Sequence, residues 1–168
     1  NWLPFYWAGY EQTTRYTYVV ENMTIEELEK NLEVDIRRRR KKAYAAGVEV
    51  IEGDDIEQFY ELNTMTFKRK GINIPYIFDF VKKLYEACKE NNAVKMYFAK
   101  YEGKVIAANF LVYDDNTVYY LMGGIHPDFK DLGGMDVVQF ESIKFALESR
   151  IETNRKVYKF LLNLTSFL

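Results

Sequence analysis

Residues 118–146 read VYYLMGGIHPDFKDLGGMDVVQFESIKFA, and this stretch decides which fold the chain adopts. The β-branched and aromatic run Val118–Met122 predicts a strand that ends at the glycine pair Gly123-Gly124. After a loop, a second pair, Gly133-Gly134, precedes apolar residues at helical spacing, which predicts a helix from about Gly134 to Ser149. The stretch is therefore a junction in which a strand leads through a loop into a helix.

The second glycine pair has two interpretations. Glycine allows another group to approach the backbone closely, and the first amides of a helix have no carbonyl partner within it. Together with the helix dipole, these amides favour an anion such as a phosphate or pyrophosphate. The alternative is that the two glycine pairs are ordinary turns at the two ends of a loop, and the pattern alone leaves both open.

The elements outside the junction predict an α+β fold of mixed α/β layers. Thr24 and Glu27 form a capping box that opens a helix, and Gly47 ends the same helix as a left-handed cap. Further helices are predicted at about 55–70 and 76–91, and strands at 15–20, 48–51, 94–101, 104–113, 117–123 and 156–162. The short turns between the strands at 94–123 indicate an antiparallel meander.

Composition narrows the class of protein. The 168 residues are 48% hydrophobic and 17% aromatic, which is typical of one packed domain. A net charge of -2 argues against a broad nucleic-acid surface, so we expect no generic DNA binding. The single cysteine, Cys88, excludes an intrachain disulfide and fits a cytoplasmic setting. No run approaches the ~20 apolar residues of a membrane span.

Six basic residues stand together at Arg37–Lys42. Consecutive residues of a helix point all round its axis, so the run cannot form one cationic face. The apolar stripe of the predicted helix passes through positions 39 and 40, so Arg39 or Arg40 is expected to lie against the domain. That arginine either packs its aliphatic stem or faces an anionic substrate.

At the junction the sequence resembles the GNAT acyltransferase fold. In that family a central strand with a splayed end leads into a helix whose amides hold the coenzyme A pyrophosphate, through a loop of the pattern Q/R-x-x-G-x-G/A. The matching stretch is Lys130–Met135, in which Gly133 fits the pattern. Lys130 replaces Arg or Gln, and Met135 stands where a small residue is usual.

Longer stretches are similar to the FemABX-like branch, which includes peptidoglycan aminoacyltransferases and acetyltransferases of cell-envelope biosynthesis. The similar stretches are PFYWAGYEQTTRYTYVV, KKAYAAGVEV, FYELNTMTFKRKGINIPY, AKYEGKVIAANFLVYDDNTVYYLMGG and GGMDVVQFESIKFA. Members have two GNAT-like halves. The resemblance therefore implies an aromatic connector at residues 1–15 and a single GNAT-like domain at 16–168, the second half of a longer protein. A strand of the type F-D-F-x-G-S usually follows, but here Lys159 replaces the Asp and the Gly-Ser is missing, so this end is atypical or truncated.

The resemblance implies a central, mostly antiparallel sheet with helices on both faces, and N-acyl transfer as the activity. The donor would be acetyl-CoA or aminoacyl-tRNA. The acceptor would be an amine of an amino-sugar, a sugar-nucleotide or a peptidoglycan precursor. Backbone near the strand end would align the donor at Leu121, Met122, Gly123 and Gly124, and the loop and helix start would bind it at Lys130, Gly133, Gly134 and Met135.

Side chains suggest further roles. His126, the single histidine, is either a base beside the donor or an exposed loop residue, with Asp128 and Asp131 nearby as turn residues. Asn109 either faces the cleft or bonds to neighbouring backbone, and Glu141 is a further candidate. Tyr119 and Tyr120 point to opposite faces of the strand, so one of them packs while the other lines the cleft. Trp7, with Phe5, Tyr6 and Tyr10, either stacks on a sugar or docks onto the missing half. No metal site is predicted.

Two other functions remain open at this point. If the chain lacks activity by itself, it would be a catalytically silent half of a two-half acyltransferase. Its role would then be structural or acceptor-binding. A nucleic-acid-binding module rests on the basic run alone and predicts binding with a steep salt dependence.

Overall fold

The computed structural model describes residues 2–11, 17–20, 23–153 and 159–163. Within these residues one six-stranded sheet has the order β1-β6-β5-β4-β3-β2. Its strands are β1 (Thr17–Val20), β2 (Glu49–Glu52), β3 (Val94–Tyr101), β4 (Lys104–Tyr113), β5 (Thr117–Ile125) and β6 (Lys159–Asn163). Neighbouring strands are antiparallel except β5 and β6, which are parallel. The predicted meander and the mostly antiparallel sheet are confirmed.

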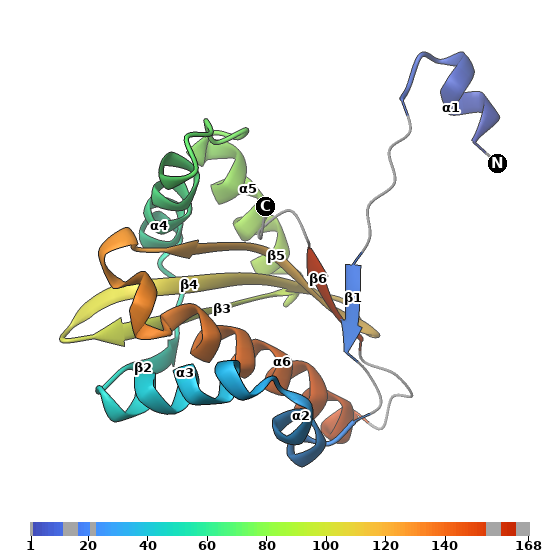
Figure 1. The fold of residues 1–168 in the computed structure, drawn as a ribbon. Helices are drawn as coiled ribbons and strands as arrows, with labels where there is room; N and C mark the ends of the chain where they lie inside the picture. The colour runs from blue at the N-terminus through green and yellow to red at the C-terminus, as the bar shows by residue number, and fades with distance from the viewer. Residues whose placement is uncertain (1, 12–16, 21–22, 154–158, 164–168) are drawn as a thin grey trace.

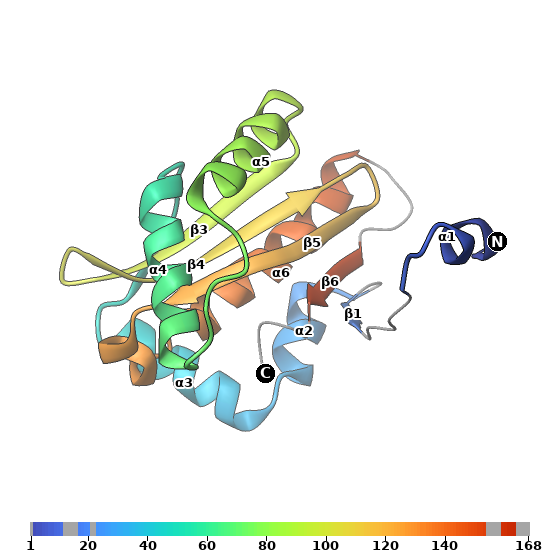
Figure 2. The same cartoon turned by 90° about the horizontal axis from the view of Figure 1, so that it is seen from above.

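Helices cover both faces of the sheet, as predicted (Figure 1). On one face lie α4 (Ile56–Arg69) and α5 (Phe78–Glu90), and on the other lie α2 (Ile25–Asn31), α3 (Val34–Ala45) and α6 (Gly134–Thr153). The view from above shows α4 crossing over the sheet and α5 lying along β3 (Figure 2). A short helix α1 (Leu3–Trp7) stands near the N-terminus, where no regular element was predicted.

Each face has its own core. Phe59 of α4 and Phe110 of β4 are fully buried between α4, α5 and the sheet, with ring centroids 5.4 Å apart. On the other face α6 buries all of the apolar residues at its helical spacing, as the period predicts. They are Val137, Val138, Phe140, Ile143, Ala146 and Leu147.

The prediction of one helix from Thr24 to Gly47 is wrong, because the segment forms two. The backbone is extended at Leu32 (ψ 140°) and Glu33 (ψ 144°), so α2 ends there and α3 begins. Both ends of the predicted helix are nevertheless as expected. Thr24 and Glu27 make the capping box, and Gly47 adopts φ +91°. Neither glycine nor proline marks the break, which explains why the apolar period did not reveal it.

The predicted loop at 124–132 is shorter than expected. Strand β5 continues through Gly124 to Ile125, and a 3-10 helix, η1 (Pro127–Leu132), follows. Helix α6 continues to Thr153, beyond the predicted end at Ser149. The strand predicted at 156–162 is found as β6, although residues 154–158 lie outside the described residues.

Candidate functional site

Strand β5 continues beyond the part that pairs with β6. The register pairs Thr117–Tyr120 of β5 with Lys159–Leu162 of β6, and the described part of β6 ends at Asn163. Within the described residues, Met122 to Ile125 of β5 pair with β4 alone. The described pairing of β5 with β6 therefore ends just before the glycine pair of the junction.

A β-bulge sets the directions of the side chains at this point. Phe110 faces Met122 across the sheet but the next residue, Leu111, faces Tyr120, so Leu121 is the extra residue. Tyr120 is 3% exposed and packs beneath α6, whereas Leu121 and Met122 both pack toward α4 and α5. Tyr119 is 38% exposed, so one tyrosine of the pair packs and the other does not.

The first glycine pair is required by packing within the chain. A Cβ on Gly123 would overlap the hydroxyl of Tyr120 and would lie 3.3 Å from Oδ1 of Asn109. A Cβ on Gly124 would lie 2.5 Å from the backbone nitrogen of Asn63 and 2.5 Å from the carbonyl carbon of Leu62. Helix α4 and strand β5 therefore touch backbone to backbone at Gly124.

Side chains of α4 bond to the outer edge of this strand end. Asn63 donates from Nδ2 to the Gly123 carbonyl at 2.7 Å, and the Ile125 amide donates to Oγ1 of Thr66 at 2.9 Å. The hydroxyl of Tyr76 donates to Oδ1 of Asn63 at 2.8 Å. Burial raises the pKa of Tyr76 to about 12, so the hydroxyl keeps its proton at neutral pH.

Sequence reasoning missed the roles of Asn63, Thr66 and Tyr76. The available signal was Asn63 itself, an amide inside the apolar stripe of α4 with an exposed fraction of only 3%. A polar side chain buried to this degree needs hydrogen-bond partners, and here they come from two different segments.

The second glycine pair is also packed by the chain. Gly133 adopts φ +75°, and a Cβ there would lie 3.0 Å from the carbonyl oxygen of Arg39. A Cβ on Gly134 would lie 2.9 Å from Ile106. The space beside these glycines is thus filled by α3 and β4, while the first amides of α6 lack carbonyl partners within the helix. Lys130 is exposed on η1, and Met135 is partly buried against the core cluster that contains Ile106 and Val137.

The two candidate arginines face carboxylates of the chain. Arg39 makes two 2.9 Å bonds to Asp136 in the first turn of α6, and this partner raises the pKa of Arg39. Arg40 is buried, bonds to both carboxylate oxygens of Glu29 at 2.9 and 3.0 Å, and stacks 3.2 Å from the ring centroid of Phe140. The expectation that one of them lies against the domain is confirmed for Arg40.

The other candidate side chains are not gathered around one point. His126 caps η1, because its Nδ1 accepts from the Asp128 amide at 3.3 Å, and its ring packs on Phe129. Asn109 is fully buried and donates from Nδ2 to Gln139 and Ser142 of α6, both at 3.1 Å. Trp7 is 74% exposed on α1, which stands away from the sheet in Figure 1.

Three further residues singled out in the sequence lie elsewhere in the fold. Glu141 accepts a hydrogen bond from the hydroxyl of Tyr44 at 3.4 Å, and Asp131 ends up on η1. Cys88 is partly buried, and burial raises the pKa of its thiol. None of these contacts brings a further titratable group to the end of β5.

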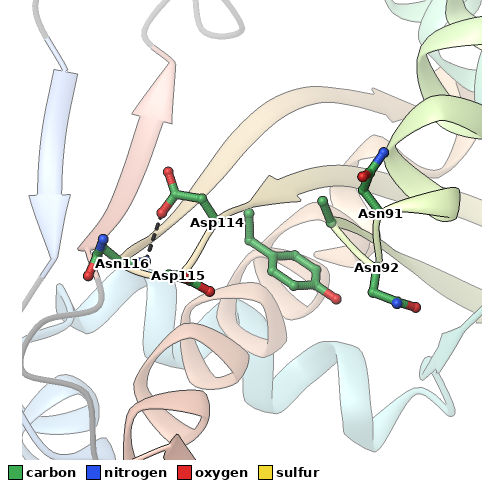
Figure 3. A pocket seen from close by; sticks show the side chains of 7 residues that line it. Asn91, Asn92, Asp114, Asp115 and Asn116 are labelled. Atoms are coloured by element: carbon green, nitrogen blue, oxygen red, sulfur yellow. Dashed lines mark hydrogen bonds between the residues drawn. The ribbon is translucent and has the colours of Figure 1, made fainter.

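A shallow hollow of about 600 Å³ lies at the other end of β5 (Figure 3). Its lining consists mainly of amide and carboxylate side chains from the turns there: Asn91, Asn92, Asp114, Asp115 and Asn116. Asp114 is engaged by the amides of its own turn. The hollow is therefore separate from the junction between β5 and α6.

Within the described ranges, the structure contains neither a helix suited to a membrane span nor a side-chain group suited to a metal ion. None of the helices there combines the length and the apolar composition that crossing a membrane requires. Among the same residues, His, Cys, Asp and Glu side chains do not form any group of three or more that could hold a metal ion.

Residues 30–162 match the family model described as an acetyltransferase (GNAT) domain. A crystal structure of FemX aligns with a TM-score of 0.76 and 15% identity over 88% of this chain and 52% of that one. The C-terminal domain of a putative lysylphosphatidylglycerol synthetase from Agrobacterium fabrum aligns with a TM-score of 0.58 and 12% identity, over 87% and 45%. The chain thus spans about half the length of these structures. No curated protein sequence matches it significantly.

Proposed function

Because the chain belongs to the acetyltransferase (GNAT) domain family, we propose that it transfers an acyl group from coenzyme A to an amine, at the end of β5. The observation that carries the proposal is that, within the described residues, the pairing of β5 with β6 ends at Tyr120, while β5 continues through the glycine pair toward η1 and α6. When bound, the donor supplies an activated thioester carbonyl. The protein must hold it, receive a neutral amine and stabilise the negative charge that develops on the carbonyl oxygen.

The amide of Gly123 is our candidate for stabilising that charge. The Gly123 carbonyl points away from β4, because it accepts from Asn63 of α4. In an antiparallel ladder the N–H and C=O of one residue point to the same side of the strand. The His126 amide donates to the Ile106 carbonyl of β4 at 2.8 Å, so by alternation Gly123 directs its N–H away from β4. A fixed amide there fits a developing oxyanion.

The start of α6 is our candidate for the phosphate groups of the donor. Its first amides, at Gly134 and Met135, carry the positive end of the dipole of a 20-residue helix. Asp136 in the same turn would repel an anion, but Arg39 pairs with its carboxylate at 2.9 Å. Lys130, exposed on η1, adds a cation close by in the chain.

The remaining candidates border the junction. We propose His126 as the group that accepts the proton of the amine, because it lies one residue after β5 and its side chain is 27% exposed. Asn109 and Tyr120 lie on the α6 side of Gly123, where they fill the space that a side chain would need. Their burial indicates that they support the strand end beneath Leu121 and Met122.

The branch and the acceptor are finer proposals. The order and spacing of the FemABX-like stretches and the similarity of the fold to FemX support an amine acceptor of the amino-sugar, sugar-nucleotide or peptidoglycan-precursor type. We propose a cytoplasmic reaction in which another half, preceding the connector at residues 1–15, completes the protein. Aminoacyl-tRNA is the alternative donor, since the loop 130–135 departs from the pyrophosphate pattern.

Titration with coenzyme A tests the donor. We expect a saturable rise in Tm with coenzyme A, because a ligand that binds only the folded state stabilises it. Lys130→Ala should weaken binding about threefold by removing a cation. Lys104→Ala, which removes an exposed lysine at the start of β4, should not. No shift at millimolar coenzyme A would exclude this donor, and filter binding of aminoacyl-tRNA would then test the alternative.

A catalytically silent half is the second candidate function. It is favoured by the chain spanning about half of the FemX structure and by the atypical tail at Lys159. It predicts that the chain binds an amino-sugar or peptidoglycan precursor without turning over acetyl-CoA. Release of free coenzyme A thiol in the presence of an amine acceptor, by the isolated chain, would contradict it.

A further inference from the structure

Asn63 joins two segments that are distant in sequence. It lies on α4 with 3% of its surface exposed, and both functional atoms of its amide are bonded. Its Nδ2 donates to the Gly123 carbonyl at 2.7 Å, and its Oδ1 accepts from the Tyr76 hydroxyl at 2.8 Å. The connection between α4 and α5, which carries Tyr76, is thereby linked to the end of β5.

Helix α4 bonds to β5 at positions that a continuing sheet strand would need. The Ile125 amide donates to Thr66 at 2.9 Å, and the Gly123 carbonyl is taken by Asn63. A strand running beside β5 beyond Tyr120 would have to pair with these same groups. The side chains of α4 therefore occupy hydrogen-bonding positions that β6 would need in order to continue along β5, and they fix the direction of the Gly123 carbonyl.

Tyr76 fixes the orientation of the Asn63 amide. An amide side chain that rotated by half a turn would present its oxygen to the Gly123 carbonyl, which is repulsive. The Tyr76 hydroxyl donates to Oδ1 and so holds Nδ2 toward the carbonyl. The ring of Tyr76, which carries this hydroxyl, packs edge-on against Phe67.

We propose that Asn63 and Tyr76 are positioning residues, which hold the Gly123 amide in the direction that stabilises the reacting carbonyl. This inference rests on the proposed function and adds to it two residues outside the junction. Neither side chain needs to touch the substrate, since Tyr76 acts through Asn63 and Asn63 acts through the backbone of β5. Their loss should therefore lower kcat more than it raises the KM for acetyl-CoA.

The chain offers a matched pair of variants for the test. Tyr76→Phe removes only the hydroxyl that orients Asn63. Tyr60→Phe removes a hydroxyl that donates to the backbone carbonyl of Tyr76, in the same connection between α4 and α5. Within the described residues, this hydroxyl has no hydrogen bond to Asn63 or to β5. Both changes should lower Tm to a similar small degree, because each loses one partly buried hydrogen bond.

Two measurements decide the outcome. Without any ligand, hydrogen exchange of the Ile125 amide, which donates to Thr66 at the same strand end, should be about fivefold faster in Tyr76→Phe and unchanged in Tyr60→Phe. In turnover, kcat should fall about tenfold in Tyr76→Phe, with the KM for acetyl-CoA changed less than about twofold. Tyr76→Phe added to Asn63→Ala should have no further effect on kcat.

Failure of this inference and failure of the proposed function give different results. Equal effects of Tyr76→Phe and Tyr60→Phe on exchange of the Ile125 amide would overturn the positioning role, whether or not the protein turns over acetyl-CoA. If exchange at Ile125 responds as expected but wild-type protein neither binds coenzyme A nor transfers an acyl group, the link from Tyr76 to β5 stands and its catalytic purpose is overturned.

Discussion

Arginines of the basic run Arg37–Lys42 have different partners. Arg38 pairs with Asp35 on the exposed side of α3, Arg39 pairs with Asp136, and Arg40 turns inward to Glu29. The run is therefore not one cationic surface. Its members are distributed around the helix axis, as consecutive helical positions must be, and the chain supplies a carboxylate to each of these three.

Arg40→Leu should leave stability unchanged or raise it, by up to about 1 kcal/mol, because replacing a buried ion pair by an apolar side chain of similar volume is often neutral or stabilising. The former partner, Glu29, is 44% exposed and can be hydrated after the change. Urea unfolding measures the difference. Unchanged coenzyme A binding in the same variant would exclude Arg40 as a ligand for the donor.

The opposite variant is the control for Arg40. Glu29→Ala leaves a guanidinium whose side chain is only 8% exposed without its carboxylate, so we expect a loss of about 2 kcal/mol. If Glu29→Ala proved neutral while Arg40→Leu destabilised the protein, stacking of Arg40 on Phe140 would be the main contribution of this residue.

Gly124→Ala tests the backbone contact between α4 and β5. The new methyl group would lie 2.5 Å from backbone atoms of Asn63 and Leu62, which cannot rotate away as a side chain can. We expect a loss of about 2 kcal/mol or more, typical of overpacking. Gly71→Ala, at a glycine with φ +68° and open space, should cost only about 1 kcal/mol of backbone strain. Equal losses would contradict the contact.

At the scale of elements, the N-terminus of α6 depends on α3. Asp136 lies in the first turn, where a carboxylate favours the helix but opposes a bound phosphate. Arg39 brings the compensating charge from α3, so the anion-binding capacity of α6 is set by the docking of another helix. This explains why the loop pattern around Gly133 could not by itself decide whether a phosphate binds.

Arg39→Gln should weaken coenzyme A binding about five- to tenfold, because it uncovers the Asp136 carboxylate beside the proposed phosphate site. The double variant Arg39→Gln with Asp136→Asn should recover most of the affinity. Calorimetric titration at two salt concentrations measures both. Arg38→Gln is the matched control, since its partner Asp35 lies on the exposed side of α3. Failure of the double variant to recover affinity would contradict the electrostatic explanation.

The elements show what local sequence encodes and what it does not. Caps are local, so Thr24, Glu27 and Gly47 marked two helix ends correctly. The break at Leu32–Glu33 depends on packing of α2 and α3 against different parts of the domain, and no residue there signals it. The hydrogen bonds from Asn63 to Gly123 and from Tyr76 to Asn63 join distant segments, and only the unusual amide in an apolar stripe hinted at them.

For the whole molecule, the fold and family followed from the order of elements around the junction, whereas the site residues did not. Glycine pairs predicted close backbone approach correctly, but at all four positions the approaching group belongs to the chain. Sequence cannot distinguish a ligand from a helix as the neighbour of a glycine. It left open whether Arg39 or Arg40 packs on the domain or contacts a substrate, and in the structure both pair with carboxylates of the chain.

The aromatic N-terminal segment provides the last prediction. None of its large side chains is buried in the described residues, and their exposed fractions range from 37% at Trp2 to 74% at Trp7. Deleting residues 1–11 should therefore change the free energy of unfolding by less than about 0.5 kcal/mol, as for other surface changes. A loss above about 1 kcal/mol in urea unfolding would show that α1 packs on the domain.

Activity of the deletion variant separates the two roles proposed for Trp7. If the segment stacks on an amino-sugar, the deletion and Trp7→Ala should both raise the KM for the acceptor several-fold and leave coenzyme A binding unchanged. If it docks onto another half of the protein, both variants should keep the acceptor KM of the isolated chain. Exposed aromatic area of this kind is commonly a contact surface. If the variants change neither acceptor binding nor association with the other half, both proposals are contradicted.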